Sequence, residues 1–356
     1  RRAAGDRLML GIGVAVYVEV TGGAGEEYAS VSVDDDGGAT IRVGTSAHGQ
    51  GHATSFAMLV GDRLGIPLDK VRFVQSDTAS VPRGGGTGGS RSLQLGGSAV
   101  AEAAEAVLAA ARELAARELE ADPADIGVDA EGRVGVAGVP ALALSWAELA
   151  STARAAGEPL EVALDHRQEA ATFPFGAHVA VVEVDRETGA VRPLRHVAVD
   201  DCGRIVNPLI VTGQQHGGIA QGMAQALWEQ MVYDADGTPL TATLADYAVP
   251  SAAELPSFET HNTETPTPLN PLGAKGIGES GTIGSTPAVH NAVIDALSHL
   301  GVRHIDMPCT PERVWRAIAA AEAGCPEPAW VAPPEVFAGL PVRGAGPEPE
   351  AASAEI

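Results

Sequence analysis

The sequence has few aromatic, cysteine and basic residues, and each shortage excludes some classes of protein. Aromatic residues make up 4% of the chain, so bulky aromatic cores are not expected. The three cysteines are odd in number and have no CxxC spacing, which argues against a disulfide framework or a zinc site and favours a reducing, cytoplasmic compartment. No apolar run reaches the roughly 18 residues that span a bilayer, so membrane association would have to come through partners.

Basic residues are also scarce: 23 Lys and Arg stand against 46 Asp and Glu, for a formal charge of −23. Such a surface repels phosphate backbones and anionic lipid, so a nucleic-acid partner is disfavoured. Glycine, in contrast, is abundant, with 43 residues in a chain of 356, a length that suits two domains. The first residues lack an initiator Met and a signal-peptide core, which suggests the interior of a longer chain or a processed start.

Hydrophobic periodicity predicts strands and helices in mixed order. Strands are expected within residues 8–20, 28–33, 40–43, 71–74, 126–136, 179–184 and 191–200, with hairpins at 28–43 and 179–200. Helices are expected at 53–64, 98–120, 145–156, 217–230 and 280–300. The order of hairpin, polar glycine loop and helix occurs twice. It favours an α+β fold with two mixed-sheet domains, at 1–165 and 166–325, and a poorly ordered tail at 326–356.

The first glycine-rich motif is His48-Gly-Gln-Gly-His52, which joins a predicted strand to a predicted helix. The free N–H groups and the dipole of a helix start favour an anion, and the glycines let a ligand approach the backbone. Gln50 can both donate and accept hydrogen bonds. A plain glycine turn with surface histidines explains the same pattern.

The second motif, Gly84 to Ser92, contains five glycines, three hydroxyl residues and one Arg in nine positions. Such a segment can form a nest of N–H groups with a cation for phosphate, although it lacks a Walker lysine. The alternative is a flexible linker.

The third segment runs from Asp200 to Pro208 and continues through Gly213-Gln-Gln-His-Gly-Gly218. Polar amides and glycines again precede a helix. Cys202 stands beside carboxylates that raise its pKa, so packing or hydrogen bonding is a better interpretation than a thiolate.

The fourth segment, Gly273-Ala-Lys-Gly-Ile-Gly-Glu-Ser-Gly281, has Gly at four of nine positions and presents Glu279 between glycines. A carboxylate placed in this way is either a solvated loop residue or an exposed general base. The residue chemistry alone leaves both interpretations open.

Together and in this order, the four segments resemble the molybdenum-cofactor-binding large subunit of the xanthine dehydrogenase and aldehyde oxidase family, over about residues 10–320. The nearest branch contains the large subunit of aerobic carbon monoxide dehydrogenase. The resemblance implies a molybdopterin cofactor, commonly the cytosine dinucleotide form, between two α+β domains. Glu279 corresponds to the family's catalytic base, and no side chain binds the metal directly. The implied cofactor-binding residues are Gln50, Gly51, His52, Thr87, Gly88, Gly89, Ser90, Arg91, Ser92, Asp201, Cys202, Gln214, Lys275, Gly276, Ile277 and Gly278.

The resemblance also implies partners, because the chain matches only the C-terminal half of such a large subunit. The N-terminal half, an iron–sulfur subunit and an FAD subunit are expected, in an assembly such as a dimer of heterotrimers. The expected activity is the insertion of water-derived oxygen into a small substrate: an aldehyde, an N-heterocycle or carbon monoxide. The loop whose cysteine holds copper in the carbon monoxide enzymes is not in this sequence. Two alternatives are a scaffold protein that kept the fold and lost the chemistry, and a plain phosphate-binding module.

Overall fold

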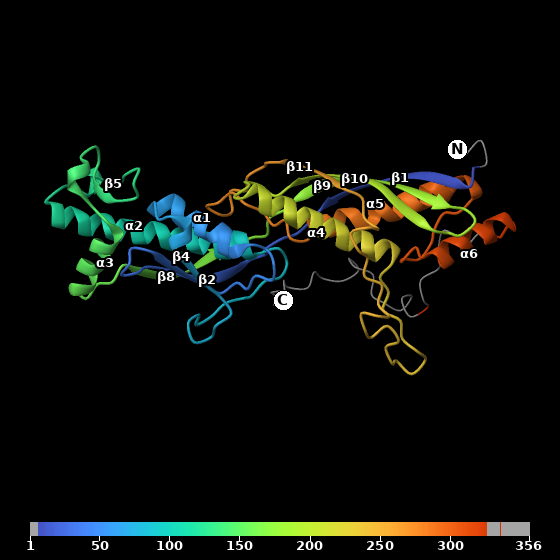
Figure 1. The fold of residues 1–356 in the computed structure, drawn as a ribbon, viewed down its shortest axis with the longest axis horizontal. Coiled ribbons are helices and arrows are strands. Elements are labelled where there is room, and N and C mark those ends of the chain that lie inside the picture. The colour runs from blue at the N-terminus through green and yellow to red at the C-terminus, as the bar shows by residue number, and fades with distance from the viewer. Residues whose placement is uncertain (1–5, 326–334, 336–356) are drawn as a thin grey trace, which may run out of the picture.

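The structure, a computed structural model, describes residues 6–325 and 335 of the chain and shows two lobes lying end to end (Figure 1). The segment 326–356, predicted to be a poorly ordered tail, lies outside the described residues apart from Glu335. No helix in the described part of the chain is both long and apolar enough to cross a membrane.

The first lobe is built on a mixed four-stranded sheet of order β4-β3-β2-β8. Its strands are β2 (Gly25–Val33), β3 (Ala39–Val43), β4 (Val71–Val74) and β8 (Glu161–Gln168). Helices α1 (His52–Leu64) and α2 (Ser98–Leu119) pack on this sheet. Apolar side chains such as Ile41, Phe56 and Leu64 are completely buried between the layers, as the period of each element predicts.

The outer end of the first lobe is a small sheet of β5 (Ile126–Val128), β6 (Val134–Val136) and β7 (Ala143–Leu144), with α3 (Trp146–Ala155) beside it. Ser145 and Glu148 form the capping box that starts α3, each side chain bonding the other residue's backbone N–H.

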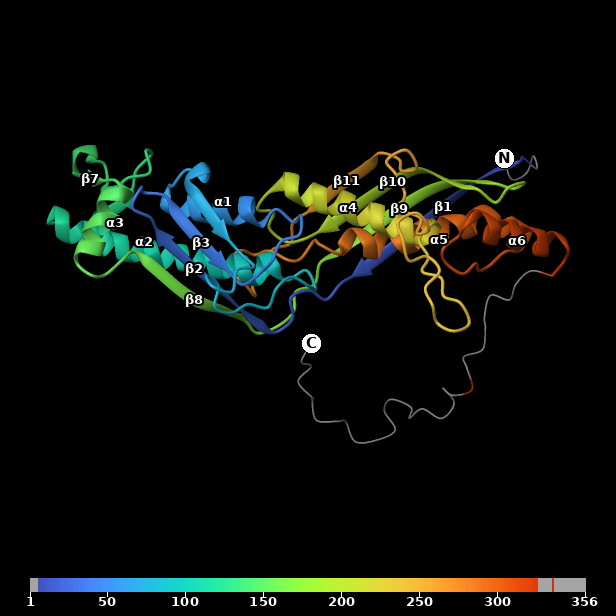
Figure 2. The ribbon, with the colours of Figure 1, turned by 60° about the horizontal axis from the view of Figure 1, so that its bottom comes forward.

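The second lobe is built on a sheet of order β1-β9-β10-β11, in which only the β10–β11 pair is parallel. Its strands are β1 (Leu8–Val18), β9 (Phe175–Asp185), β10 (Val191–Asp201) and β11 (Phe258–Thr263). Helices α4 (Pro208–Leu227) and α5 (Ser280–Leu297) pack against each other, with α5 against the sheet, and α6 (Pro311–Glu322) lies at the far end (Figure 2).

Glycines let β1 approach α5 closely. A Cβ at Gly11 or Gly13 would lie 2.0 Å from a carbonyl oxygen of α5. Because real Cβ atoms never come so close to a backbone atom, an alanine at either position would force the strand and the helix apart.

The α+β class with mixed sheets is confirmed, as are both hairpins and the long helix at 98–119. One correction concerns β1, which precedes the first lobe in the chain but pairs with β9 in the second lobe along its whole length. The division at residue 165 therefore remains a proposal for the two lobes, with β1 counted in the second. The sequence analysis also missed β8, β11 and α6.

The start of α4 is a second correction, since the helix begins at Pro208 and not at residue 217. Proline suits the first helical position, and the Asn207 side chain accepts a hydrogen bond from the Ile210 N–H. This Asn-Pro start lies within the third glycine-rich segment, which the sequence analysis placed before the helix.

Candidate functional site

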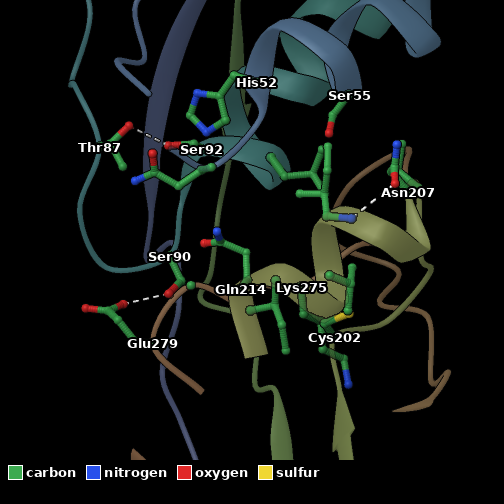
Figure 3. Close-up of a pocket in the computed structure, with 18 of the residues that line it drawn as sticks. His52, Ser55, Thr87, Ser90, Ser92, Cys202, Asn207, Gln214, Lys275 and Glu279 are labelled. Atoms are coloured by element: carbon green, nitrogen blue, oxygen red, sulfur yellow. Dashed lines mark hydrogen bonds between the residues drawn. The ribbon is translucent and has the colours of Figure 1, made fainter. Parts of the chain in front are cut away.

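A cleft of about 300 Å³ lies where the two lobes meet, and all four glycine-rich segments line it (Figure 3). All but three of the predicted site residues line this cleft: Gln50, His52, Thr87, Gly88, Gly89, Ser90, Ser92, Cys202, Gln214, Lys275, Gly276, Ile277, Gly278 and Glu279. Gly51, Arg91 and Asp201 are not among the lining residues but lie next to them in the chain.

The start of α1 forms one wall of the cleft. Gly51 is the N-cap, in a left-handed conformation with φ 71°, and a Cβ there would lie 2.7 Å from the side chain of Ile210. No side chain caps this helix start, so its N–H groups are left for a ligand. The buried His52 ring stacks on Phe56. Burial, with a smaller effect of His48, lowers the pKa of His52 to about 4, so the imidazole is neutral at pH 7.

The Gly84–Ser92 loop forms a second wall and presents hydroxyl groups. Thr87 Oγ1 and Ser92 Oγ are 2.8 Å apart, and Thr87 Oγ1 also accepts from the Ser46 N–H. The Ser90 hydroxyl donates a 2.6 Å hydrogen bond to Oε2 of Glu279. Cβ atoms at Gly88 and Gly89 would meet nothing within 4 Å, so the backbone there is open to a ligand.

The Arg91 guanidinium, expected from the sequence to face phosphate, contacts Glu27 and is not among the groups that line the cleft. It lies 3.3 Å from Glu27 Oε2 and donates to the Glu26 carbonyl at 3.0 Å. The Glu27 carboxylate is fully buried and also accepts from the Gly85 N–H. An anion this deep attracts the nearest cation, so Arg91 supports the loop from behind.

The end of β10 supplies Asp201 and Cys202. Burial alone would raise the pKa of Asp201, but hydrogen bonds from the Gly203 N–H, Lys275 and neighbouring threonines outweigh it and lower that pKa below its usual value. Burial, reinforced by Asp201, raises the pKa of Cys202 to about 12, so the thiol stays protonated, as the sequence predicted.

The fourth segment brings Lys275 and Glu279 to the cleft. The Lys275 ammonium is 3.1 Å from Asp201 Oδ1 and 4.9 Å from the centre of the Phe175 ring, so its charge is already paired. A Cβ at Gly276 would lie 2.4 Å from the Ser90 Cβ, so the two loops touch across the cleft. Glu279 is exposed and forms the N-cap of α5 without a side-chain capping bond, so its carboxylate is available for other work.

The sequence analysis missed several residues that line the cleft, among them Arg204, Asn207 and Ile210. Arg204 is exposed, and no carboxylate in the described part of the chain is within ion-pair distance of it. The sequence did contain a signal for Arg204, because it is a basic residue that directly follows Asp-Cys-Gly in the third glycine-rich segment. The neighbour of Glu279, Glu19, had no such signal, because it follows β1 and is 260 positions away in the chain.

These groups suit a flat, hydrogen-bonding heterocycle with a phosphate-bearing arm. Gln50 and Gln214 supply amide donors and acceptors, and Thr87, Ser90 and Ser92 supply hydroxyl groups to the same cleft. The open glycines of the second loop leave room for an arm that carries phosphate, with Arg204 as an available cation. A pterin with a dinucleotide arm has this combination of groups, so the residues present fit such a cofactor.

The fold and the site together define a class of two-lobed α+β proteins with a glycine-lined cleft between the lobes. Residues 1–256 match the family model described as "Molybdopterin cofactor-binding domain", and the chain belongs to that family.

Curated relatives support this assignment. The chain is 40% identical over 326 residues to the carbon monoxide dehydrogenase large chain of Hydrogenophaga pseudoflava, which covers 87% of this chain and 40% of that one. It is 38% identical to the nicotine 6-hydroxylase large subunit of Paenarthrobacter nicotinovorans, over 86% of this chain and 40% of that subunit. The chain thus spans about two-fifths of the length of these relatives.

Solved structures agree with the sequence comparison. The reconstituted CO dehydrogenase from Oligotropha carboxidovorans superposes with a TM-score of 0.83 at 34% identity, covering 91% of this chain and 42% of that chain. The quinoline 2-oxidoreductase from Pseudomonas putida 86 gives a TM-score of 0.81 at 36% identity, covering 89% of this chain and 43% of that chain.

Proposed function

We propose that this chain is the catalytic, cofactor-holding part of a molybdenum hydroxylase that oxidises a small electron-poor substrate, such as an aldehyde, an N-heterocycle or carbon monoxide. One observation carries the proposal: Glu279 is presented uncapped at the start of α5, on the rim of a cleft whose other walls suit a pterin dinucleotide. The cofactor, when bound, would supply the two-electron oxidation with oxygen taken from water.

The residues of this chain would bind the cofactor and handle the proton. Gln50, Gln214 and the hydroxyls of the Gly84–Ser92 loop would hold the heterocycle and its arm by hydrogen bonds. Glu279 would take up a proton at a carboxylate oxygen, with the Ser90 hydroxyl orienting the carboxylate through its bond to Oε2. His52, neutral and buried against Phe56, would close the inner end of the cleft to water.

The test is a paired measurement on the assembled complex. The purified complex should contain molybdenum and release a cytosine nucleotide on acid treatment. Glu279→Gln keeps the size and hydrogen bonding of the side chain but removes its basicity, so metal content should stay normal while turnover falls by roughly 100-fold or more. Glu187→Gln, in the exposed turn after β9, is the matched control. An assembled complex without molybdenum, or full turnover by Glu279→Gln, would overturn the proposal.

We further propose that the remaining part of a large subunit, an iron–sulfur subunit and an FAD subunit complete the enzyme, in an assembly such as a dimer of heterotrimers. An apolar stripe on β1 supports a protein partner: Ile12, Val14, Val16 and Val18 are 53–77% exposed on the face opposite α5. Exposed apolar patches of this extent mark interfaces. Co-purification of such subunits, lost when Val14 and Val16 are changed to Lys, would support the proposal, and unchanged assembly would contradict it.

A further inference from the structure

A connected series of titratable and hydroxyl side chains runs from Glu279 into the core of the second lobe. None of its inner members lines the cleft. Tyr17 donates to Asp200 Oδ1 at 2.7 Å, and Asp200 Oδ1 is 3.1 Å from His178 Nε2. The series consists of Glu19, Ser280, Tyr17, Asp200, His178 and His196.

The outer pair of the series is Glu19 and Glu279. Glu19 follows β1, is only 9% exposed, and its carboxyl group lies close enough to that of Glu279 to feel its negative charge. Two neighbouring carboxylates repel each other, and a proton held by one of them removes this repulsion. Burial, then repulsion by Glu279, raises the pKa of Glu19 to about 7, so Glu19 can hold or release this proton near neutral pH.

The inner end of the series is an anion that collects hydrogen bonds. Asp200 accepts from Tyr17, from His178 and, at 2.8 Å, from Gln215 Nε2. Burial alone would raise the pKa of Asp200, but these bonds outweigh it and lower that pKa below its usual value. Burial lowers the pKa of His196 to about 4, and its Nδ1 has no partner in the described part of the chain. A proton therefore has no hydrogen-bonded group to move to beyond His196 within the described residues.

Ser280 links the two ends. It is completely buried, its hydroxyl donates to Glu19 Oε2 at 3.4 Å, and it lies beside the Tyr17 hydroxyl. Because Tyr17 gives its proton to Asp200, its oxygen is left to accept from Ser280, which can then accept from a protonated Glu19. When Glu19 is ionised, the Ser280 hydroxyl can donate to Glu19 instead. Rotation of one hydroxyl thus matches the series to either charge state of Glu19.

We propose that Glu19 is the proton partner of Glu279, receiving the proton that Glu279 takes up, with Ser280, Tyr17 and Asp200 as positioning residues. In this step the O–H bond on Glu279 breaks as one on Glu19 forms, so the negative charge moves from Glu19 to Glu279 and no electrons are transferred. The inference rests on the proposed function for the role of Glu279. The charged and titratable groups that face Glu19 are Glu279 on the α5 side and Tyr17 on β1.

The first test needs no turnover. Infrared difference titration of the assembled complex should show a protonated carboxyl band that disappears as the pH rises through about 7. Glu19→Gln should remove this band, whereas Glu183→Gln, a buried carboxyl that pairs with Arg192, should retain it. Glu279→Gln should retain the band with its midpoint moved to lower pH, because the repulsion is gone. A band that survives in Glu19→Gln would overturn the inference.

The second test is the pH profile of kcat. Glu19→Gln should lower kcat by roughly 10-fold or more and remove the limb that titrates near pH 7, with KM unchanged. Tyr17→Phe should move that limb and the infrared midpoint together, which a purely structural change would not do. If Glu279→Gln retains turnover, the proposed function fails while the infrared result still stands. If Glu279→Gln loses turnover but Glu19→Gln leaves the pH profile unchanged, the proposed function stands and only the proton-partner role of Glu19 is contradicted.

Discussion

The hydroxyl of Ser90 donates a 2.6 Å hydrogen bond to Oε2 of Glu279, and this bond joins the two lobes across the rim of the cleft. Ser90 comes from the loop before α2, and Glu279 from the start of α5. Directly beside it, Gly276 lies so close to Ser90 that any side chain would collide. Two chain segments 189 positions apart therefore meet at this side of the cleft and leave no room for a side chain at position 276.

Replacing Ser90 with Ala should lower kcat more than it raises KM. The hydrogen bond to a carboxylate is worth roughly 1.5–3 kcal/mol, and its loss leaves the proposed base free to rotate. We expect about a 10-fold lower kcat with cofactor content unchanged, measured by steady-state kinetics. Ser80→Ala, which removes a hydroxyl bonded only to the surface residue Asp77, serves as the control. Equal effects of the two changes would show that the Ser90 bond does not orient Glu279.

Two neighbouring glycines of α4 should respond oppositely to the same substitution. A Cβ at Gly218 would lie 2.9 Å from the Gly281 Cα in α5, whereas one at Gly217 would meet nothing within 4 Å. Gly218→Ala should therefore push the helices apart and lower the free energy of unfolding by roughly 1–3 kcal/mol. Gly217→Ala should leave it unchanged or raise it by up to about 1 kcal/mol, since alanine favours the helix. Denaturant unfolding of both variants checks this, and equal destabilisation would contradict it.

Features that depend on residues close together in the chain could be predicted from the sequence, whereas features that depend on residues far apart in the chain could not. The helices at 53–64 and 98–120 and both hairpins were predictable, because their periodicity and turn residues are local. The pairing of β1 with β9 was not, since β1 carries the same alternation whichever sheet it joins. The motifs indicated that Gln50, Ser90 and Glu279 share one site, and all three line the same cleft. They did not indicate that Arg91 turns toward Glu27. A partner such as Glu27 or Glu19 is chosen by tertiary packing, which leaves no pattern in the sequence.

The buried ion pair between Lys275 and Asp201 should be costly to break from the lysine side. Asp201 is completely buried, and Lys275→Met would leave its carboxylate without a counter-ion. We expect a loss of about 3 kcal/mol in the free energy of unfolding, partly restored in the Lys275→Met, Asp201→Asn double variant. Full stability in Lys275→Met alone would show that the hydrogen bonds to Asp201 suffice.

Asp201 also gives a pH dependence with a definite direction. Its pKa is lowered in the folded protein, so it binds protons more weakly there than in the unfolded chain. Its contribution to stability is present above the unfolded value of about 4 and is lost as the pH falls through the lower folded value. Asp201→Asn should therefore flatten the acid side of the curve of unfolding free energy against pH. An unchanged acid limb in this variant would contradict the assignment.

Arg204 should contribute more to cofactor retention than any other basic residue that lines the described cleft. Lys275 is neutralised by Asp201, and Arg91 lies outside the cleft against Glu27, which leaves the Arg204 guanidinium available for phosphate. A charge-assisted bond to phosphate is worth roughly 1.5–3 kcal/mol, so Arg204→Gln should weaken retention at least 10-fold, and Arg204→Lys should weaken it less. Pterin nucleotide retained after dialysis at increasing salt measures this. Arg167→Gln makes the same change of charge on an exposed residue of β8 away from the cleft, and it should leave retention unchanged. If both variants lose cofactor equally, the effect belongs to the overall charge of −23 and not to Arg204.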